Sequence, residues 1–145
     1  DSVLNIVNSS MMIRSKEESI STLDICCVDL YTGRCVFYKA GASFSYATKK
    51  KKLIKIEKPS MPIGILRNIT FEKSAVTIGD GDKIVLMSDG VSENAKERFR
   101  EILMSVETTD GEIASKQLAK AALASDDSKK HDDITVVAAI LTKNA

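Results

Sequence analysis

Apolar and polar residues alternate along much of the first half of the chain, which is the spacing of half-buried β-strands. The later run 83–88 is so apolar that both faces of its strand should be buried, and 134–141, rich in valine and isoleucine, is expected to be a closing central strand. Turn-forming residues separate these segments. We therefore predict strands at 22–30, 35–40, 44–48, 53–57, 69–78, 83–88 and 134–141.

Helical spacing occurs at the start of the chain and again late in it. Leu4, Val7 and Met11 repeat at helical intervals, and we expect the chain to enter this first helix partway, because no capping residue precedes it. Two further helices are predicted at about 94–104 and 111–124.

The order of these elements indicates the fold class. Hairpins dominate the first half and the later helices are grouped, which is typical of an α+β layered domain with mainly antiparallel sheets rather than a parallel βαβ array. A chain of 145 residues is long enough for one sizeable core and short for two, so residues 1–145 are expected to form a single domain.

Composition and charge exclude some classes of protein. The chain is 43% hydrophobic and 28% charged with a net charge of +1, as in ordinary globular proteins. Its dense basic run, 49–52, falls at the tip of a predicted hairpin and is interpreted as a solvated turn rather than a nucleic-acid site. The apolar runs are far shorter than the roughly 20 residues that cross a bilayer.

The cysteines point to a reducing setting. Cys26, Cys27 and Cys35 cannot all pair within one chain, and they lack the spacing of a zinc site, so we expect buried core thiols. No secretory signal is evident at the beginning of the sequence. A cytoplasmic location fits these observations.

Carboxylates stand at the ends of the two most apolar predicted strands. Asp89 follows 83–88 and precedes Gly90, and Asp132 and Asp133 precede 134–141. If these strands are antiparallel neighbours, Asp89 and Asp132 converge, and carboxylate oxygens suit Mg²⁺ or Mn²⁺. The alternative is that these aspartates belong only to a turn and a polar strand entry.

Two motifs favour the metal site by resemblance. These motifs are LMSDGV at 86–91 and DDITVV at 132–137. They resemble the metal motifs of the PPM (type 2C-like) metal-dependent protein phosphatases, of the stage II sporulation protein E type, and the resemblance extends over nearly the whole chain. Further similar segments are STLD at 21–24, KAGASF at 39–44 and MPIGI at 61–65.

The resemblance implies a β-sandwich flanked by helices, with two Mn²⁺ or Mg²⁺ ions at one end of the sandwich. It makes Asp89 and Asp132 metal ligands, gives Gly90 the turn, and leaves Asp133 as a neighbour of less certain role. A metal-activated water would attack the phosphorus of a phosphoserine or phosphothreonine directly. The segment 39–43 is interpreted as a glycine-containing strand connection rather than a substrate site.

The chain departs from the family pattern at its beginning. The family carries an earlier Asp-Gly motif whose aspartate bridges both metals, and this motif is absent from the sequence, so we expect the chain by itself to bind metal poorly and to be inactive or weakly active. His131 is interpreted as an exposed loop residue. Two alternatives stay open: a non-catalytic signalling module of the same fold, and a receiver-like domain, against which the hairpins argue.

For partners, the resemblance implies a phosphorylated regulatory protein, such as an anti-sigma-factor antagonist. It leaves open a homodimer and a parent protein that is tethered to a membrane through segments outside this chain. Nucleic acid is not expected as a partner, because the charge balance is nearly neutral.

Overall fold

The computed structural model describes residues 2–14, 20–67, 69–91, 93–124 and 132–143. Every strand and helix expected from the sequence is present, with shifted boundaries. The elements are α1 Ser2–Arg14, β1 Leu23–Val28, β2 Arg34–Ala40, β3 Ser45–Lys49, β4 Lys52–Ile56, β5 Glu72–Thr77, β6 Lys83–Met87, α2 Glu93–Ser105, α3 Gly111–Ala124 and β7 Val136–Ile140.

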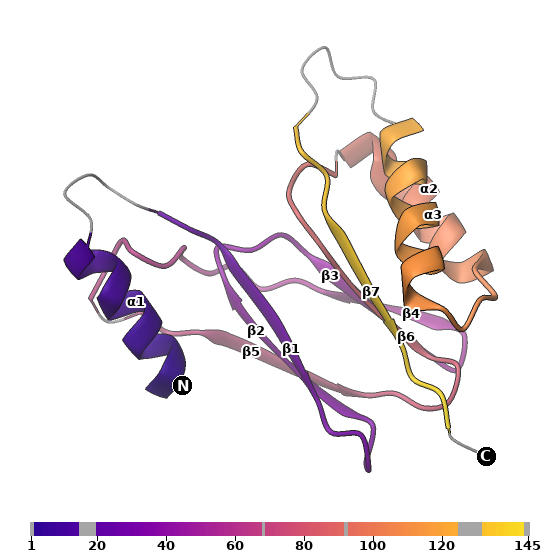
Figure 1. The fold of residues 1–145 in the computed structure, drawn as a ribbon, viewed down its shortest axis with the longest axis horizontal. Helices are drawn as coiled ribbons and strands as arrows, with labels where there is room; N and C mark the ends of the chain where they lie inside the picture. The colour runs from indigo at the N-terminus through magenta and orange to yellow at the C-terminus, as the bar shows by residue number, and fades with distance from the viewer. Residues whose placement is uncertain (1, 15–19, 68, 92, 125–131, 144–145) are drawn as a thin grey trace.

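The strands form two antiparallel sheets, which confirms the predicted α+β sandwich. One sheet has the order β1-β2-β5 and the other β4-β3-β6-β7. Every pair of neighbouring strands in them is antiparallel. Figure 1 shows α1 beside the three-stranded sheet and α2 with α3 beside the four-stranded one. The layers therefore run helix, sheet, sheet, helices.

Three apolar clusters hold these layers together. Phe37 of β2 and Ile84 of β6 belong to the cluster between the two sheets. Tyr46 of β3 and Phe99 of α2 belong to the cluster under α2 and α3, where their rings stack with centroids 6.3 Å apart. A smaller cluster around Phe71 packs against α1. The four-stranded sheet thus buries one face on the other sheet and one face on α2 and α3, whereas the outer face of the three-stranded sheet includes exposed residues such as Cys27 and Ala75.

The contact between α1 and the rest of the fold includes a buried polar residue. Asn8 is fully buried, and its side-chain amide donates hydrogen bonds to the carbonyl oxygens of Leu66 (2.8 Å) and Arg67 (3.2 Å). Its side-chain oxygen accepts one from the backbone N–H of Gly64 (2.9 Å). The helix is therefore held in register on the loop that follows β4 as well as by apolar packing.

The strand β6 lies inside its sheet, as its apolar sequence predicted. It pairs with β3 on one side and β7 on the other, and Ile84, Val85 and Met87 are all buried. At the hairpin tip between β3 and β4, Lys50 and Lys51 are exposed and have φ values of 49° and 61°. Such φ values are those of a tight two-residue hairpin turn, so the lysine run is the expected solvated tip.

The expectation that 134–141 is a central strand was wrong for the described residues. Among them β7 is an edge strand, bonded to β6 alone, and Val137 is 55% exposed. Val136 and Ala138 do pack against the cluster under the helices. An apolar run indicates that the side chains of a strand pack against neighbouring residues. It does not specify the position of that strand in the strand order.

None of the described helices combines the length and the apolar character needed to cross a membrane.

The prediction of three buried thiols was wrong for one of them. Cys35 is buried and Cys26 partly buried, but Cys27 is exposed, because consecutive residues of β1 point to opposite faces. Burial raises the pKa of Cys26 to about 12, and the neighbouring Cys35 thiol adds to the shift. The three thiols therefore differ in access to reagents and in their ease of ionisation.

We expect one thiol to react rapidly with a disulfide reagent such as Ellman's reagent at pH 8 in the folded protein. Cys27 should account for it, because reaction requires an accessible thiolate. Cys26 and Cys35 should react only on unfolding. The Cys27→Ser variant, assayed by absorbance, should lose the rapid phase, and a rapid phase that persists in it would contradict this assignment.

The ring of Phe99 should contribute strongly to stability because it is fully buried between α2 and the four-stranded sheet. Phe99→Ala is expected to lower the free energy of unfolding by about 3–5 kcal/mol through lost burial and the cavity left behind. Urea denaturation measures this change. The matched control is Arg100→Ala, whose exposed pairing with Glu97 should change stability by no more than about 1 kcal/mol.

Candidate functional site

The aspartates predicted to bind metal lie where β6 ends and β7 begins. The backbone N–H of Ser88 donates to the carbonyl oxygen of Thr135 (3.0 Å), and the N–H of Thr135 donates to the Ser88 hydroxyl oxygen (2.9 Å). The Ser88 hydroxyl in turn donates to the carbonyl oxygen of Asp133 (3.1 Å). The two strand ends are thus joined beyond their last ladder pair, Met87 with Val136.

Gly90 permits an unusually close backbone approach at this junction. A Cβ at residue 90 would stand 2.4 Å from the carbonyl oxygen of Asp133 and 3.0 Å from its carbonyl carbon. Any side chain here would therefore push the two segments apart. The turn that carries Asp89 packs directly against the segment that carries Asp133, with Asp132 next to it in the chain.

The carboxylates themselves face solvent. Asp89, Asp132 and Asp133 are all exposed, whereas Gly90 is buried. One carboxylate oxygen of Asp132 accepts a hydrogen bond from the backbone N–H of Asp133 at 2.9 Å. The fold therefore brings the four predicted residues to one edge of the four-stranded sheet and leaves carboxylate oxygens available there. His131 lies outside the described residues.

A cavity of about 230 Å³ adjoins this edge between the two sheets. Asp89 and Asp24 supply its two carboxylates, and Asp132 and Asp133 are not part of its wall. Its lining consists of Thr22, Asp24, Ala42, Ser43, Leu86, Met87, Ser88, Asp89, Thr135 and Val137. Polar groups of both sheets thus converge beside Asp89.

Sequence reasoning missed an ion pair that involves Asp24, one of the residues lining this cavity. The Lys39 side chain is 1% exposed, and its ammonium donates to Asp24 Oδ2 (2.7 Å), Ser45 Oγ (2.7 Å) and the carbonyl oxygen of Ser43 (2.6 Å). The segment 39–43 was interpreted as a plain strand connection. The available signal was periodicity, because Lys39 shares the strand face of the buried Cys35 and Phe37.

The donor set suits a hard cation but is incomplete in the described residues. Carboxylate oxygens are the ligands that Mg²⁺ and Mn²⁺ prefer, and Mg²⁺ commonly uses one or two carboxylates and keeps several waters. Within these residues no group of three or more histidine, cysteine, aspartate or glutamate side chains is placed to enclose an ion. Asp89 and Asp132 therefore fit an open, hydrated site better than a closed protein cage.

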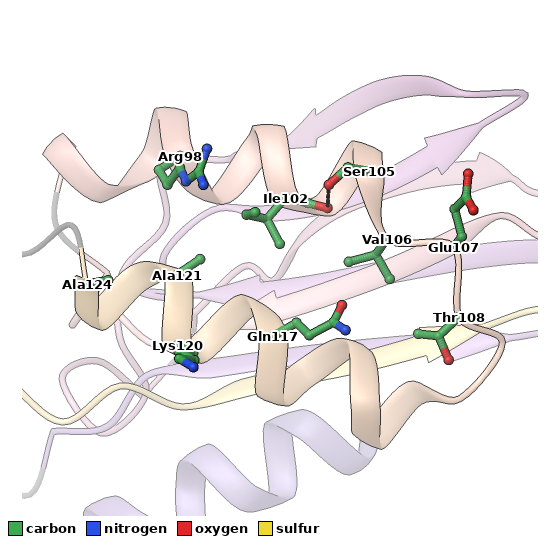
Figure 2. Close-up of a pocket in the computed structure, with 10 residues that line it drawn as sticks. All are labelled: Arg98, Ile102, Ser105, Val106, Glu107, Thr108, Gln117, Lys120, Ala121 and Ala124. Atoms are coloured by element: carbon green, nitrogen blue, oxygen red, sulfur yellow. Dashed lines mark hydrogen bonds between the residues drawn. The ribbon is translucent and has the colours of Figure 1, made fainter.

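A larger cavity of about 780 Å³ lies elsewhere, in the groove between α2 and α3. Figure 2 shows Arg98 and Ile102 from α2 facing Lys120 and Ala121 from α3, with Glu107 at the far end. The groove contains no pair of carboxylates and none of the predicted site residues. Size alone therefore does not make it the candidate site.

Comparisons with known proteins agree on one family. The family model for stage II sporulation protein E (SpoIIE) matches residues 1–141. The SpoIIE protein of Bacillus subtilis (strain 168) is 26% identical over 147 residues, which cover 97% of this chain and 18% of that protein. The chain thus spans about a fifth of the length of this curated relative.

Solved structures give the same fold. The phosphatase domain of the cell fate determinant SpoIIE from Bacillus subtilis, presoaked with manganese, matches with a TM-score of 0.71 and 25% identity, covering all of this chain and 67% of that one. The catalytic domain of the serine/threonine protein phosphatase PstP, in complex with 2 manganese ions, matches with a TM-score of 0.74 and 18% identity, covering 97% and 70%. The second likeness concerns the fold alone.

The close approach at Gly90 generates a stability prediction. Gly90→Ala should lower the free energy of unfolding by about 1–3 kcal/mol, because the new methyl group meets backbone atoms that cannot rotate away. Gly79→Ala is the matched control, since a Cβ there meets nothing closer than 3.8 Å. Urea denaturation of both variants compares them, and equal stability would show that the turn at residue 90 tolerates a side chain.

Proposed function

The chain belongs to the stage II sporulation protein E family, and on that premise we propose that residues 1–145 form part of a single metal-dependent protein serine/threonine phosphatase domain. In this proposal Asp89 and Asp132 bind a divalent cation, Mn²⁺ or Mg²⁺. The reaction is the hydrolysis of a phosphate monoester by a metal-activated water.

The observation that carries the proposal is the junction of β6 with β7. Antiparallel pairing brings the end of one strand to the beginning of the other, and Ser88 and Thr135 bind each other through backbone and hydroxyl groups. A carboxylate follows the first strand and another precedes the second. Both are exposed at the same edge of the sheet, where a solvent-borne phosphoprotein has access.

Each residue at the junction has a distinct task in this proposal. Asp89 and Asp132 supply oxygen ligands, and Gly90 allows the turn to lie against residue 133. The backbone of Asp133 orients Asp132 through the hydrogen bond to its carboxylate, at 2.9 Å. A bound cation supplies a lowered pKa for its water and neutralises phosphate charge. No nucleophilic side chain is needed, so the cysteines have no part in the reaction.

The substrate that we propose is a phosphoserine or phosphothreonine on a regulatory protein, of the kind of an anti-sigma-factor antagonist. The exposed position of both aspartates supports a protein substrate rather than a small molecule enclosed in a pocket. A homodimer, a cytoplasmic setting and a membrane tether in the parent protein stay predictions.

One observation favours a second candidate function. Among the described residues no group of three or more histidine, cysteine, aspartate or glutamate side chains is placed to hold a metal ion, so they do not enclose a cation by themselves. A non-catalytic signalling module of the same fold would need no more than this. Metal binding by the full-length protein distinguishes the two candidates.

Asp89→Asn in the full-length protein should abolish Mn²⁺-dependent phosphate release. Using p-nitrophenyl phosphate and a phosphoserine peptide as probes, we expect the rate to fall on the order of 10²-fold or more, because a charge-stabilising group at the reacting centre is lost. Measured Mn²⁺ affinity should fall in parallel, since the amide is a weaker ligand.

The matched control for this experiment is Asp80→Asn. Asp80 also precedes a glycine, but it stands before β6 instead of after it and accepts a hydrogen bond from the N–H of Lys143 at 2.8 Å. Its replacement should leave the rate and the Mn²⁺ affinity unchanged. A comparable loss in both variants, or none in Asp89→Asn, would overturn the proposed function.

A further inference from the structure

The buried ion pair beside the cavity connects the two sheets. Asp24 of β1 and Lys39 of β2 are direct partners in the three-stranded sheet. Lys39 also reaches Ser45 of β3 in the other sheet, and the Ser45 hydroxyl donates to the same Asp24 oxygen, Oδ2, at 2.6 Å. One carboxylate oxygen therefore receives two hydrogen bonds at the point where the sheets meet.

Stability alone does not account for this arrangement. Removing an ammonium and a carboxylate from water has a cost that their attraction often fails to exceed, and an apolar pair of similar volume is frequently as stable. Lys39 is 1% exposed and the side chain of Asp24 13% exposed. A charged pair in such a buried place therefore suggests a functional role for its charge or for the second carboxylate oxygen of Asp24, Oδ1.

The remaining oxygen of Asp24 is the unusual feature. Oδ1 is buried and has no hydrogen-bond partner among the described residues, whereas Oδ2 is fully engaged. Buried acceptors nearly always have a partner, either protein or water. Asp24, the residue that carries this unpartnered oxygen, lines the same cavity of about 230 Å³ as Asp89.

The Ser88 hydroxyl, which also lines the cavity, does not donate a hydrogen bond to Asp24 Oδ1. The Ser88 hydroxyl donates to the carbonyl oxygen of Asp133, and its oxygen accepts from Thr135. A space of this size holds water molecules, and a water needs polar partners such as these. Waters bound to a hard cation are strong donors, and such cations keep several of them.

We propose that Oδ1 of Asp24 accepts a hydrogen bond from a water molecule bound to the cation at Asp89, so that Asp24 is a positioning residue of the metal centre. Lys39 and Ser45 hold the carboxylate in place through Oδ2 and leave Oδ1 directed to that water. The inference rests on the proposed function, because it requires a cation at Asp89. It adds a residue from the other sheet to a site otherwise built on β6 and β7.

Isothermal titration calorimetry of the full-length protein with MnCl₂ tests this role. Asp24→Asn should weaken Mn²⁺ binding about 10–100-fold, the loss typical of residues that orient metal ligands. The double variant Asp24→Leu/Lys39→Met removes the pair without leaving an unpaired charge and should weaken binding to the same extent. Lys39→Met alone keeps the carboxylate, which Ser45 still holds through Oδ2, and should therefore weaken Mn²⁺ binding less than Asp24→Asn does.

The control for general damage is Asp82→Asn. Asp82 is also buried and hydrogen-bonded, accepting from the N–H groups of Lys50 (2.9 Å) and Gly79 (2.8 Å), but it precedes β6. This variant should lower the unfolding midpoint in urea and leave Mn²⁺ affinity unchanged. It shows how much affinity changes when a buried carboxylate is lost away from the site.

The outcomes separate the two ideas. Unchanged Mn²⁺ affinity in Asp24→Asn and in the double variant would overturn the role of Asp24. Equal weakening by Asp24→Asn and Lys39→Met would also overturn it, because that result is expected if the ion pair only stabilises the fold. If the wild-type protein binds no Mn²⁺, or Asp89→Asn binds it as well as wild type, the proposed function itself fails.

Discussion

The antiparallel pairing of β6 with β7 is the constraint on which the candidate site depends. The ladder runs from Lys83 with Ile140 to Met87 with Val136, and it continues into the hydrogen bonds between Ser88 and Thr135. A slip of one residue would turn the apolar side chains of both strands to their opposite faces. The same slip would move Asp89 away from residues 132 and 133, so core packing and site geometry depend on one register.

The helices secure this register from one side. α3 begins at Gly111, where a Cβ would stand 2.6 Å from the carbonyl oxygen of Ala138, so the helix lies very close to β7. Asp110 caps it by accepting hydrogen bonds from the N–H groups of Glu112 (2.8 Å) and Ile113 (3.1 Å). The cap fixes where the helix starts, and the start fixes how closely it packs on the strand that carries the site.

The two Asp-Gly pairs that flank β6 show that a dipeptide does not specify a role. A Cβ at Gly81 would meet nothing within 4 Å, and this glycine has a φ of 75°, so Asp80-Gly81 is an ordinary turn. Gly90 is required instead by backbone atoms of residue 133. Its neighbour Asp89 is exposed beside the segment that carries Asp132 and Asp133. This proximity of carboxylates makes Asp89 a candidate metal ligand, which Asp80 is not.

The sequence by itself determined the local elements and the candidate ligands. Alternation, near-continuous apolar runs and turn residues indicated the strands. The positions of Asp89 and Asp132 beside the two most apolar strands, with motifs that resemble those of a known family, indicated a candidate metal site. The sequence did not determine the strand order. It predicted a central strand at 134–141, whereas β7 is an edge strand in the described part of the chain. Also beyond the sequence were the exposure of Cys27 and the buried ion pair of Lys39 with Asp24 beside the cavity. Local patterns report short-range preferences and burial, whereas strand order and a buried ion pair depend on which distant segments the fold brings into contact, and only the tertiary structure decides that.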